Sequence, residues 1–235
     1  MKNHNACLLL FVKYPEKGQV KLRLSADLNV DIVQELYRRF VYDTLATVKK
    51  IDAEIFVCFF PPDAQKKFQE WLGSDLVFLP QQGTDLGERM KNSFSSAFLQ
   101  GFRRVILMGS DSPDLPASFL QNSLAELQTH DVVLGPSSDG GYYLIGFRDT
   151  SFDPLVFDDI HWSSPRVLKE TMEKIQCKKN RLSLLPVWSD VDTIIDLKNL
   201  IQRNRNTSFK SSQTITFVQQ NKILLEDDDV TKPKK

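Results

Sequence analysis

The sequence predicts an α/β protein built on an open, doubly wound sheet. Five short apolar runs lack the alternation of half-exposed strands, which suits strands covered on both faces. They occupy residues 6–12, 54–60, 75–80, 104–108 and 131–135. Helical patterns separate these runs, and such alternation gives parallel pairing through right-handed crossovers. A sixth run, YYLIGF (142–147), follows a short turn, so we expect a mostly parallel, partly mixed sheet.

The clearest helical pattern spans residues 30–51, where apolar residues recur at three- and four-residue spacing. Shorter patterns of the same kind predict helices at 63–72, 86–102, 117–128, 165–176 and 193–204. Beyond residue 204 the pattern decays, although TITFV (214–218) favours a short strand. The last ten residues, which include EDDD at 226–229, hold too little apolar surface to offset the entropy of ordering them. We therefore expect a main domain over residues 1–204 and a C-terminal extension over 205–235, disordered at its end.

Length and charge restrict the function further. The 235 residues suffice for one large α/β domain with a full core. Lysine and arginine together number 30, as do aspartate and glutamate, so the chain has no general attraction for nucleic acid, and any phosphate-binding patch is local. The run ACLLLFV (6–12) is too short to span a membrane, and no signal-peptide cleavage site follows it. We expect a cytoplasmic protein without a membrane span or a nucleic-acid partner.

Ligands of open α/β sheets bind beyond the carboxyl ends of the strands, which directs attention to the loops there. The first of these loops, KYPEKGQVKLRL (13–24), is rich in basic residues. Ammonium and guanidinium groups gathered in this way suit a di- or triphosphate, and Gly18 lets the backbone approach a ligand closely. A solvated basic turn is the alternative, because neither GxxxxGK[ST] nor GxGxxG is present. The basic residues are Lys13, Lys17, Lys21 and Arg23.

The stretch GSDSPDLP (109–116) follows the fourth apolar run. Pro113 keeps Ser112 out of the α region, which stiffens the backbone around the two aspartates. A hard cation such as Mg²⁺ takes one or two protein carboxylates and completes its coordination with phosphate and water. Asp111, directly after the strand, is therefore the better candidate for a metal ligand, with simple turn chemistry as the alternative. Asp114 is either a second ligand or a cap of the helix that follows.

The stretch GPSSDGGYYLIG (135–146) follows the fifth run. Gly140 and Gly141 allow either a tight hairpin turn or the close approach of a sugar or base to the main chain. Asp139 is a candidate for holding a substrate hydroxyl. If the stretch is only a hairpin, the two tyrosines after the glycines point to opposite faces of the sheet.

Two later stretches carry further candidates. WSDVDTIIDL (188–197) places Asp190 and Asp192 just ahead of a helix. Asp192 is either a helix cap or a metal carboxylate brought in from far along the chain. Trp162, in DDIHWSSP (158–165), is a candidate to stack on an acceptor, with simple packing as the alternative.

Six stretches stand in a consistent order: FVKYPEKGQVKLRL (11–24), QQGTDLGERM (81–90), GSDSPDLP (109–116), GPSSDGGYYLIGF (135–147), HWSSP (161–165) and DVDT (190–193). In this order and spacing the chain resembles a bacterial family of small glycosyltransferase-like proteins in the nucleotide-diphospho-sugar transferase superfamily. It is more distantly similar to the molybdenum-cofactor and phospholactate guanylyltransferases. The resemblance runs from about Cys7 to Leu200 and implies the GT-A fold, a Rossmann-like three-layer α/β/α sandwich.

The resemblance also implies roles for the matched residues. Asp111 and Asp192 match the metal ligands, with Mg²⁺ or Mn²⁺ as the cation, and Asp111 and Asp139 are the carboxylates expected to take part in catalysis. Gly87 and Arg89 are implied to lie near the base or ribose. The implied phosphate-binding residues are Lys13, Gly18, Lys21 and Arg23. The residues implied to line the sugar or acceptor side are Gly140, Gly141, Tyr142 and Trp162.

Together these residues predict a metal-dependent transferase that uses a nucleotide-activated donor and a small-molecule acceptor. Glycosyl transfer from a nucleotide sugar is the main expectation, because the first loop has only four basic residues and the apolar Leu22 stands where the family commonly has a threonine, which favours a diphosphate over a triphosphate. Ser164 also replaces a family threonine but keeps its hydroxyl. Nucleotidyl transfer from a nucleoside triphosphate, with release of pyrophosphate, is the alternative. A nucleotide-binding module without catalysis is the second alternative and predicts nucleotide binding that needs no divalent metal.

Overall fold

The computed structural model describes residues 5–223, and its contacts group the chain into two compact units. Among the described residues, the first unit consists of residues 5–14 and 44–190, and the second of residues 15–43 and 191–223. The predicted boundary at residue 204 stays a prediction. The tail expected to be disordered, with EDDD at 226–229, lies outside the described residues.

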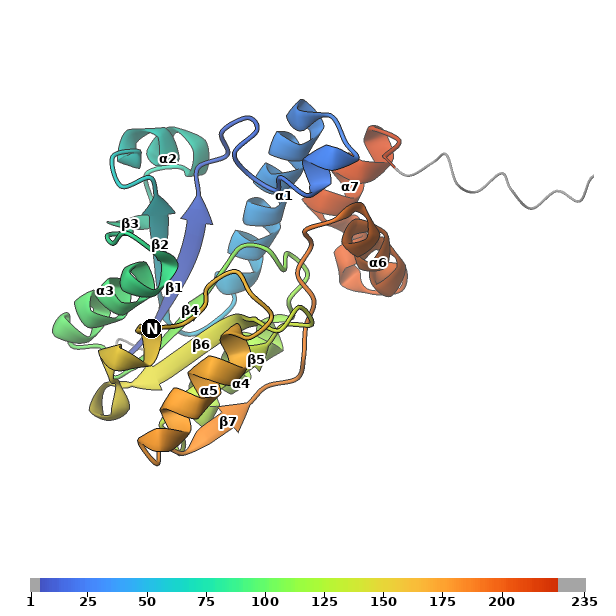
Figure 1. The fold of residues 1–235 in the computed structure, drawn as a ribbon. Coiled ribbons are helices and arrows are strands. Elements are labelled where there is room, and N and C mark those ends of the chain that lie inside the picture. Colours follow the sequence, from blue (N-terminus) through green and yellow to red (C-terminus); the bar gives the residue numbers. More distant parts are fainter. Residues whose placement is uncertain (1–4, 224–235) are drawn as a thin grey trace, which may run out of the picture. The chain divides into compact units, whose positions relative to one another are not determined.

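The first unit is built on a seven-stranded sheet with the strand order β3-β2-β1-β4-β6-β5-β7 (Figure 1). Its strands are β1 (Ala6–Lys13), β2 (Glu54–Phe60), β3 (Val77–Pro80), β4 (Arg104–Met108), β5 (Val132–Pro136), β6 (Tyr142–Arg148) and β7 (Leu182–Leu184). β6 is antiparallel to both β4 and β5, and the other pairs are parallel. This confirms the predicted mostly parallel, partly mixed sheet. β7 has no counterpart in the prediction, because three residues carry no periodic signal.

One face of the sheet packs against two α-helices and a 3₁₀ helix. They are α3 (Leu86–Leu99), η3 (Pro154–Phe157) and α5 (Val167–Cys177), with the short η2 (Asp149–Ser151) before η3. A buried apolar cluster on this face includes Leu9 of β1, Phe94 of α3 and Ile175 of α5. Residues 6–12 of β1 are all buried, so this strand needs no polar alternation.

The other face of the sheet packs against α2 (Gln65–Leu72) and α4 (Ala117–Glu126). Phe68 of α2 meets Phe59 of β2 with ring centroids 5.3 Å apart. Phe119 of α4 meets Tyr143 of β6 at 6.4 Å. Helices therefore cover both faces, which is the three-layer α/β/α arrangement that the sequence predicts.

The second unit holds the basic loop and the C-terminal helices. Its elements are η1 (Leu24–Ala26), the first part of α1 (Val30–Val48), α6 (Ile194–Asn204), η4 (Ser208–Ser211) and α7 (Gln213–Gln220). The expected helices at 30–51 and 193–204 are thus confirmed, with ends that differ by at most three residues.

The predicted strand at TITFV (214–218) is wrong, because these residues lie within α7. The Oγ of Ser212 accepts a hydrogen bond from the backbone N–H of Ile215, which caps the helix. The carboxylate of Asp43, a buried residue of α1, accepts the N–H groups of Gln213 and Thr214 at 3.0 and 2.8 Å. Tertiary capping therefore overrides the β-propensity of a short segment rich in threonine and valine.

None of the described helices combines the length and the apolar composition that crossing a membrane requires. The longest helix of the second unit, α1, carries charged residues such as Asp31, Glu35 and Arg39.

Candidate functional site

A pocket of about 120 Å³ lies in the first unit, at the carboxyl ends of β4 and β5. Three carboxylates line it, from Asp111, Asp139 and Asp190. The remaining lining residues are Met108, Gly109, Ser112, Ser137, Gly141, Tyr142 and Tyr143. The structure thus brings several of the predicted site residues together at the edge of the sheet where open α/β folds bind ligands.

Asp111 lies three residues beyond β4, and its side chain is exposed. The chain turns directly after it, and the N–H of Leu115 donates to the carbonyl oxygen of Ser112 at 3.1 Å. Pro113 disfavours the helical region at Ser112, and α4 begins only after Pro116. Asp111 is therefore placed where a ligand in the pocket can reach it.

Asp114 does not cap α4, so that alternative is wrong. The helix begins after Pro116 and has no side-chain cap. The buried carboxylate of Asp114 instead accepts a hydrogen bond of 3.1 Å from Nε1 of Trp188. This bond joins the loop after β4 to the segment after β7, which is a structural role and does not place Asp114 in the pocket lining.

Asp190 is a pocket carboxylate whose sequence position alone predicts no role. Its Oδ1 accepts a hydrogen bond of 2.8 Å from the hydroxyl of Ser137, the residue directly after β5. Trp188 pairs in parallel with Ser137, and its N–H donates to the carbonyl of Pro136 at 3.1 Å. The pairing of β5 with β7 thus carries Asp190 to the pocket, which the sequence could not show because β7 is too short to be recognised.

Asp139 belongs to a tight hairpin turn between β5 and β6, as one of its two interpretations predicts. Its Oδ1 accepts the N–H of Gly141 at 2.9 Å. Gly140 has a φ of +91°, and an added Cβ there would lie 2.3 Å from the carbonyl oxygen of Pro165, so only glycine fits. Because Asp139 is exposed and also lines the pocket, the hairpin interpretation and a role in substrate binding are compatible.

The two tyrosines after this turn point to opposite faces of the sheet, as predicted for a hairpin. Tyr143 packs its ring against Gly135, and its hydroxyl donates to the carbonyl of Pro186 at 3.0 Å. Tyr142 packs against the apolar cluster on the α3 and α5 face. Burial raises the pKa of both phenols well above the usual range, and for Tyr142 the nearby hydroxyl of Thr171 partly offsets this rise. Both groups therefore stay protonated at neutral pH and are unsuited to act as bases.

Gly87 and Trp162 contact each other outside the pocket lining. An added Cβ on Gly87 would lie 2.7 Å from Nε1 of Trp162 and 2.8 Å from the carbonyl of Phe157, so Gly87 makes room for the indole. Arg89 donates from Nε to the carbonyl of Asp85 at 2.9 Å, and its guanidinium lies 4.5 Å from the ring centroid of Phe60. These contacts show packing, and the predicted roles of the three residues in ligand binding stay predictions.

The basic loop of the second unit contains a close ion pair. Nζ of Lys21 lies 2.8 Å from Oδ1 of Asp192, and the Lys21 side chain is only 4% exposed. Gly18 has a φ of +70° with no atom within 4 Å of an added Cβ, which leaves space beside the backbone. Lys17 pairs on the surface with Asp31 at 2.6 Å. Two other basic residues of the loop are exposed. Arg23 belongs to the second unit, and Lys13, the last residue of β1, belongs to the first.

Asp192 is not the N-cap of α6, which is Thr193. The Thr193 hydroxyl accepts the N–H of Asp196 at 3.2 Å, and Oδ2 of Asp196 accepts the N–H of Thr193 at 2.8 Å. This reciprocal capping box satisfies the first turn of the helix. The carboxylate of Asp192 therefore remains available for the ion pair with Lys21.

The pocket offers the donor atoms that Mg²⁺ or Mn²⁺ prefers. Among the described residues, no three histidine, cysteine, aspartate or glutamate side chains are arranged to hold a metal ion by themselves. Asp111, Asp139 and Asp190 nevertheless supply carboxylate oxygens at one place. Mg²⁺ usually binds through one or two carboxylates, with water and substrate phosphate completing the shell. The residues present thus fit a cation that is bound jointly by protein and phosphate.

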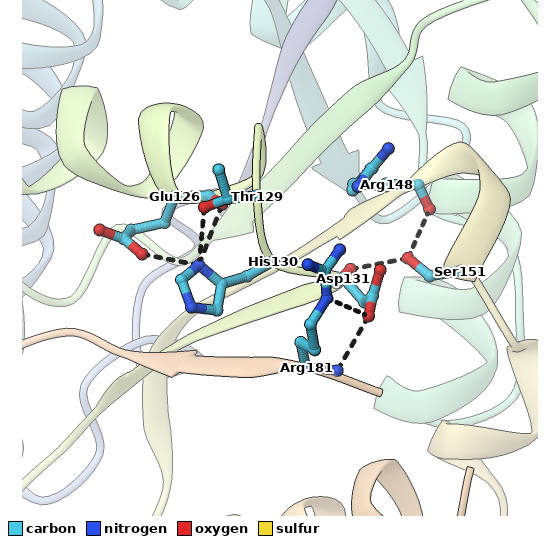
Figure 2. Close-up of polar contacts among 7 residues, drawn as sticks. All are labelled: Glu126, Thr129, His130, Asp131, Arg148, Ser151 and Arg181. Carbon is cyan, nitrogen blue, oxygen red and sulfur yellow. Dashed lines mark hydrogen bonds and ion pairs between the residues drawn. The ribbon is translucent and has the colours of Figure 1, made fainter. Parts of the chain in front are cut away.

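A second polar cluster lies at the other end of β5 from the pocket (Figure 2). Asp131 accepts hydrogen bonds from the backbone N–H of Arg181 at 2.9 Å and from its Nε at 3.4 Å, and the Ser151 hydroxyl donates to the Asp131 carbonyl at 2.7 Å. Burial opposes the charge of Asp131, but the bonds from Arg181 outweigh it and hold the pKa of this carboxyl below its usual value. Nδ1 of His130 lies 2.9 Å from Oε2 of Glu126. The Asp131 contacts connect segments at strand ends and the His130 contact closes the end of α4, so we assign the cluster a structural role.

Comparison with known proteins relates the chain to one family and to a wider fold. The family described as "uncharacterized protein conserved in bacteria" (DUF2064) matches residues 44–164. A solved structure from Desulfovibrio desulfuricans G20, whose own assignment as a nucleotide-diphospho-sugar transferase is provisional, is 45% identical with a TM-score of 0.91 and covers 94% of this chain and 96% of that chain. No curated protein sequence matches the chain.

Two distant structures share the fold. The 4-diphosphocytidyl-2C-methyl-D-erythritol synthase of Anaerococcus prevotii DSM 20548 is 10% identical with a TM-score of 0.56 and covers 86% of this chain and 97% of that chain. Rv0371c of Mycobacterium tuberculosis H37Rv, in complex with manganese, is 14% identical with a TM-score of 0.51 and covers 85% of this chain and 98% of that chain.

Proposed function

The chain belongs to the bacterial family DUF2064, and we propose that it is a transferase that uses a nucleotide-activated donor with Mg²⁺ or Mn²⁺ and transfers a glycosyl group from a nucleotide sugar. The observation that carries the proposal is the pocket with Asp111, Asp139 and Asp190 at the carboxyl ends of β4 and β5. The relative from D. desulfuricans, which is 45% identical, supports the same class of donor.

Asp111 is the proposed cation ligand in the pocket, and Asp192 stays the second proposed ligand because of the family resemblance. Asp190 adds a carboxylate to the pocket that Asp111 lines, and a hydrogen bond from Ser137 orients it. When bound, the cation would offset the charge of the donor diphosphate and of the leaving nucleoside diphosphate. The manganese complex of the Rv0371c structure, which shares the fold, is compatible with this choice of metal.

The basic loop is the proposed phosphate site. The exposed side chains of Lys13 and Arg23 and the open backbone at Gly18 suit phosphate oxygens, and Lys21 adds a further cation. In glycosyl transfer, an acceptor oxygen forms a bond to the anomeric carbon while the bond from that carbon to the diphosphate breaks. The exposed carboxylate of Asp139 is the proposed group that holds the acceptor hydroxyl and takes its proton.

Nucleotidyl transfer is the alternative, because the fold is shared with a 4-diphosphocytidyl-2C-methyl-D-erythritol synthase. In that reaction an acceptor phosphate attacks the α-phosphorus of a nucleoside triphosphate, and pyrophosphate leaves. The same loop and carboxylates would serve both reactions, so the identity of the leaving group separates them.

The test is to incubate the protein with nucleotide sugars and with nucleoside triphosphates, each with a pool of small hydroxyl and phosphate acceptors, in the presence and absence of Mn²⁺. Metal-dependent release of a nucleoside diphosphate from a nucleotide sugar is the expected result. Release of pyrophosphate from a triphosphate would support the nucleotidyl alternative instead. Nucleotide binding that is the same without metal, and is followed by no product, would favour a non-catalytic module.

A further inference from the structure

We propose that the ion pair between Lys21 and Asp192 makes cation binding dependent on the nucleotide. Lys21 competes with the cation for the Asp192 carboxylate, and a donor phosphate relieves the competition by taking Lys21 as its own partner. This inference rests on the proposed function, since the phosphate and the cation are those of the proposed site. The ion pair would therefore couple the binding of the nucleotide to that of the cation, which a lysine that only binds phosphate would not do.

Both the backbone and the ammonium group of Lys21 are held in defined positions. Its backbone has a φ of +48°, which residues other than glycine seldom adopt and which recurs at functional sites. Its ammonium lies 2.8 Å from Oδ1 of Asp192 and 5.8 Å from the ring centroid of Phe40. With 4% of the side chain exposed, Lys21 faces Asp192 and the ring, and it must leave this position to meet a phosphate in solvent.

The position of Asp192 is held by the helix that follows it. Its backbone N–H donates to Oδ2 of Asp196 at 3.2 Å, and the same carboxylate completes the capping box with Thr193. The main chain at Asp192 is thus anchored, while 36% of its side chain is exposed. The carboxylate is therefore accessible to a cation from solvent, but one oxygen already bonds to Lys21.

The two cations cannot share the carboxylate without a cost. An ammonium within hydrogen-bond distance of a metal ligand repels a divalent cation strongly where solvent screening is low. A diphosphate carries more negative charge than one carboxylate and offers several acceptor oxygens, so it can draw the ammonium away. By thermodynamic linkage, a nucleotide that removes Lys21 raises the affinity for the cation, and the cation raises the affinity for the nucleotide by the same factor.

The test measures Mn²⁺ binding to the full chain from the electron paramagnetic resonance signal of free Mn²⁺, without nucleotide. Lys21→Met keeps the apolar stem and removes the charge, and we expect it to lower the Mn²⁺ dissociation constant by about tenfold or more. Lys21→Gln is the second variant, in case the methionine variant folds poorly. Lys210→Met is the matched control, because it removes an exposed charge of η4, outside the basic loop, and should leave the constant unchanged.

If Lys21 competes for Asp192, the tighter Mn²⁺ binding of Lys21→Met must depend on the Asp192 carboxylate. The same measurement is therefore made in an Asp192→Asn background, where Lys21→Met should not tighten Mn²⁺ binding. Unchanged or weaker Mn²⁺ binding in both Lys21 variants, or an equal gain without the Asp192 carboxylate, would overturn the inference. UDP, CDP, GDP and ADP are then added in turn, and the effective one should tighten Mn²⁺ binding in the wild type more than in Lys21→Met. If a nucleotide bound to the wild type without tightening Mn²⁺ binding, the inferred coupling would be wrong, whereas binding of none of the four would contradict the proposed function instead.

Discussion

The hydroxyl of Ser137 donates a hydrogen bond of 2.8 Å to Oδ1 of Asp190. Ser137 directly follows β5, and Asp190 lies six residues beyond β7, so the bond joins two loops at one end of the sheet. Both residues line the pocket that contains Asp111. This contact makes Asp190 part of the candidate site on geometry alone.

Replacement of Asp190 by asparagine should weaken donor binding in the presence of Mn²⁺. The change removes a negative charge beside Asp111 and keeps the shape of the side chain, so we expect about a tenfold loss of affinity. Calorimetric titration with nucleotide sugars measures it. Asp149→Asn is the control, since it removes a carboxylate that pairs with Arg103 at 2.6 Å beyond the other end of β6. Equal affinities of the wild type and Asp190→Asn would exclude Asp190 from the site.

Replacement of Gly87 by alanine should destabilise the fold. The new methyl group would lie 2.7 Å from Nε1 of Trp162 and 2.8 Å from a backbone oxygen, so neighbouring groups must shift. Overpacking of this kind costs about 1–3 kcal/mol in the free energy of unfolding, measured with urea. Gly109→Ala is the control, because its nearest neighbour, Oδ2 of Asp111, is at 3.7 Å. A midpoint for Gly87→Ala equal to that of the wild type would mean that Trp162 does not pack here.

Asp131 should contribute stability that depends on pH. Burial disfavours its charge, but hydrogen bonds from Arg181 lower the folded-state pKa below the unfolded value. The contribution is therefore complete above the unfolded pKa of about 3.9 and is lost as the pH falls through the lower folded pKa. Asp131→Asn should reduce the free energy of unfolding by about 1 kcal/mol at neutral pH. Urea unfolding of both proteins, repeated in acid, should show this difference shrink; a constant difference would rule out the ionic contribution.

Much of the fold could be predicted because its strands and helices carry strong periodic patterns. The apolar runs at 6–12, 54–60 and 104–108 each became a strand within one residue of the expected ends. The strand prediction for TITFV was wrong because the helix that forms there is capped by Asp43, which lies 170 positions from Gln213 in the sequence. Local propensity cannot register a cap that arrives from so far along the chain.

The candidate site was predictable only in part. Asp111 and Asp139 follow recognisable strands, and the family resemblance that six motifs indicate is confirmed by the match to DUF2064. Asp190 was missed because it reaches the pocket through a three-residue strand and a contact with Ser137. The burial of Lys21 against Asp192 was also not foreseen, since a basic loop gives no sign of which cation is enclosed.

The most direct test of the account compares the wild type with Asp111→Asn in the binding of UDP-, GDP-, CDP- and ADP-sugars, with and without Mn²⁺. We predict that the wild type binds one of these donors and that Mn²⁺ strengthens the binding. In Asp111→Asn this strengthening should fall by about tenfold or more, because a carboxylate ligand of the cation is lost. If Asp111→Asn kept the full effect of Mn²⁺ on donor binding, the pocket at the end of β4 would not be the metal site and the central claim would be wrong.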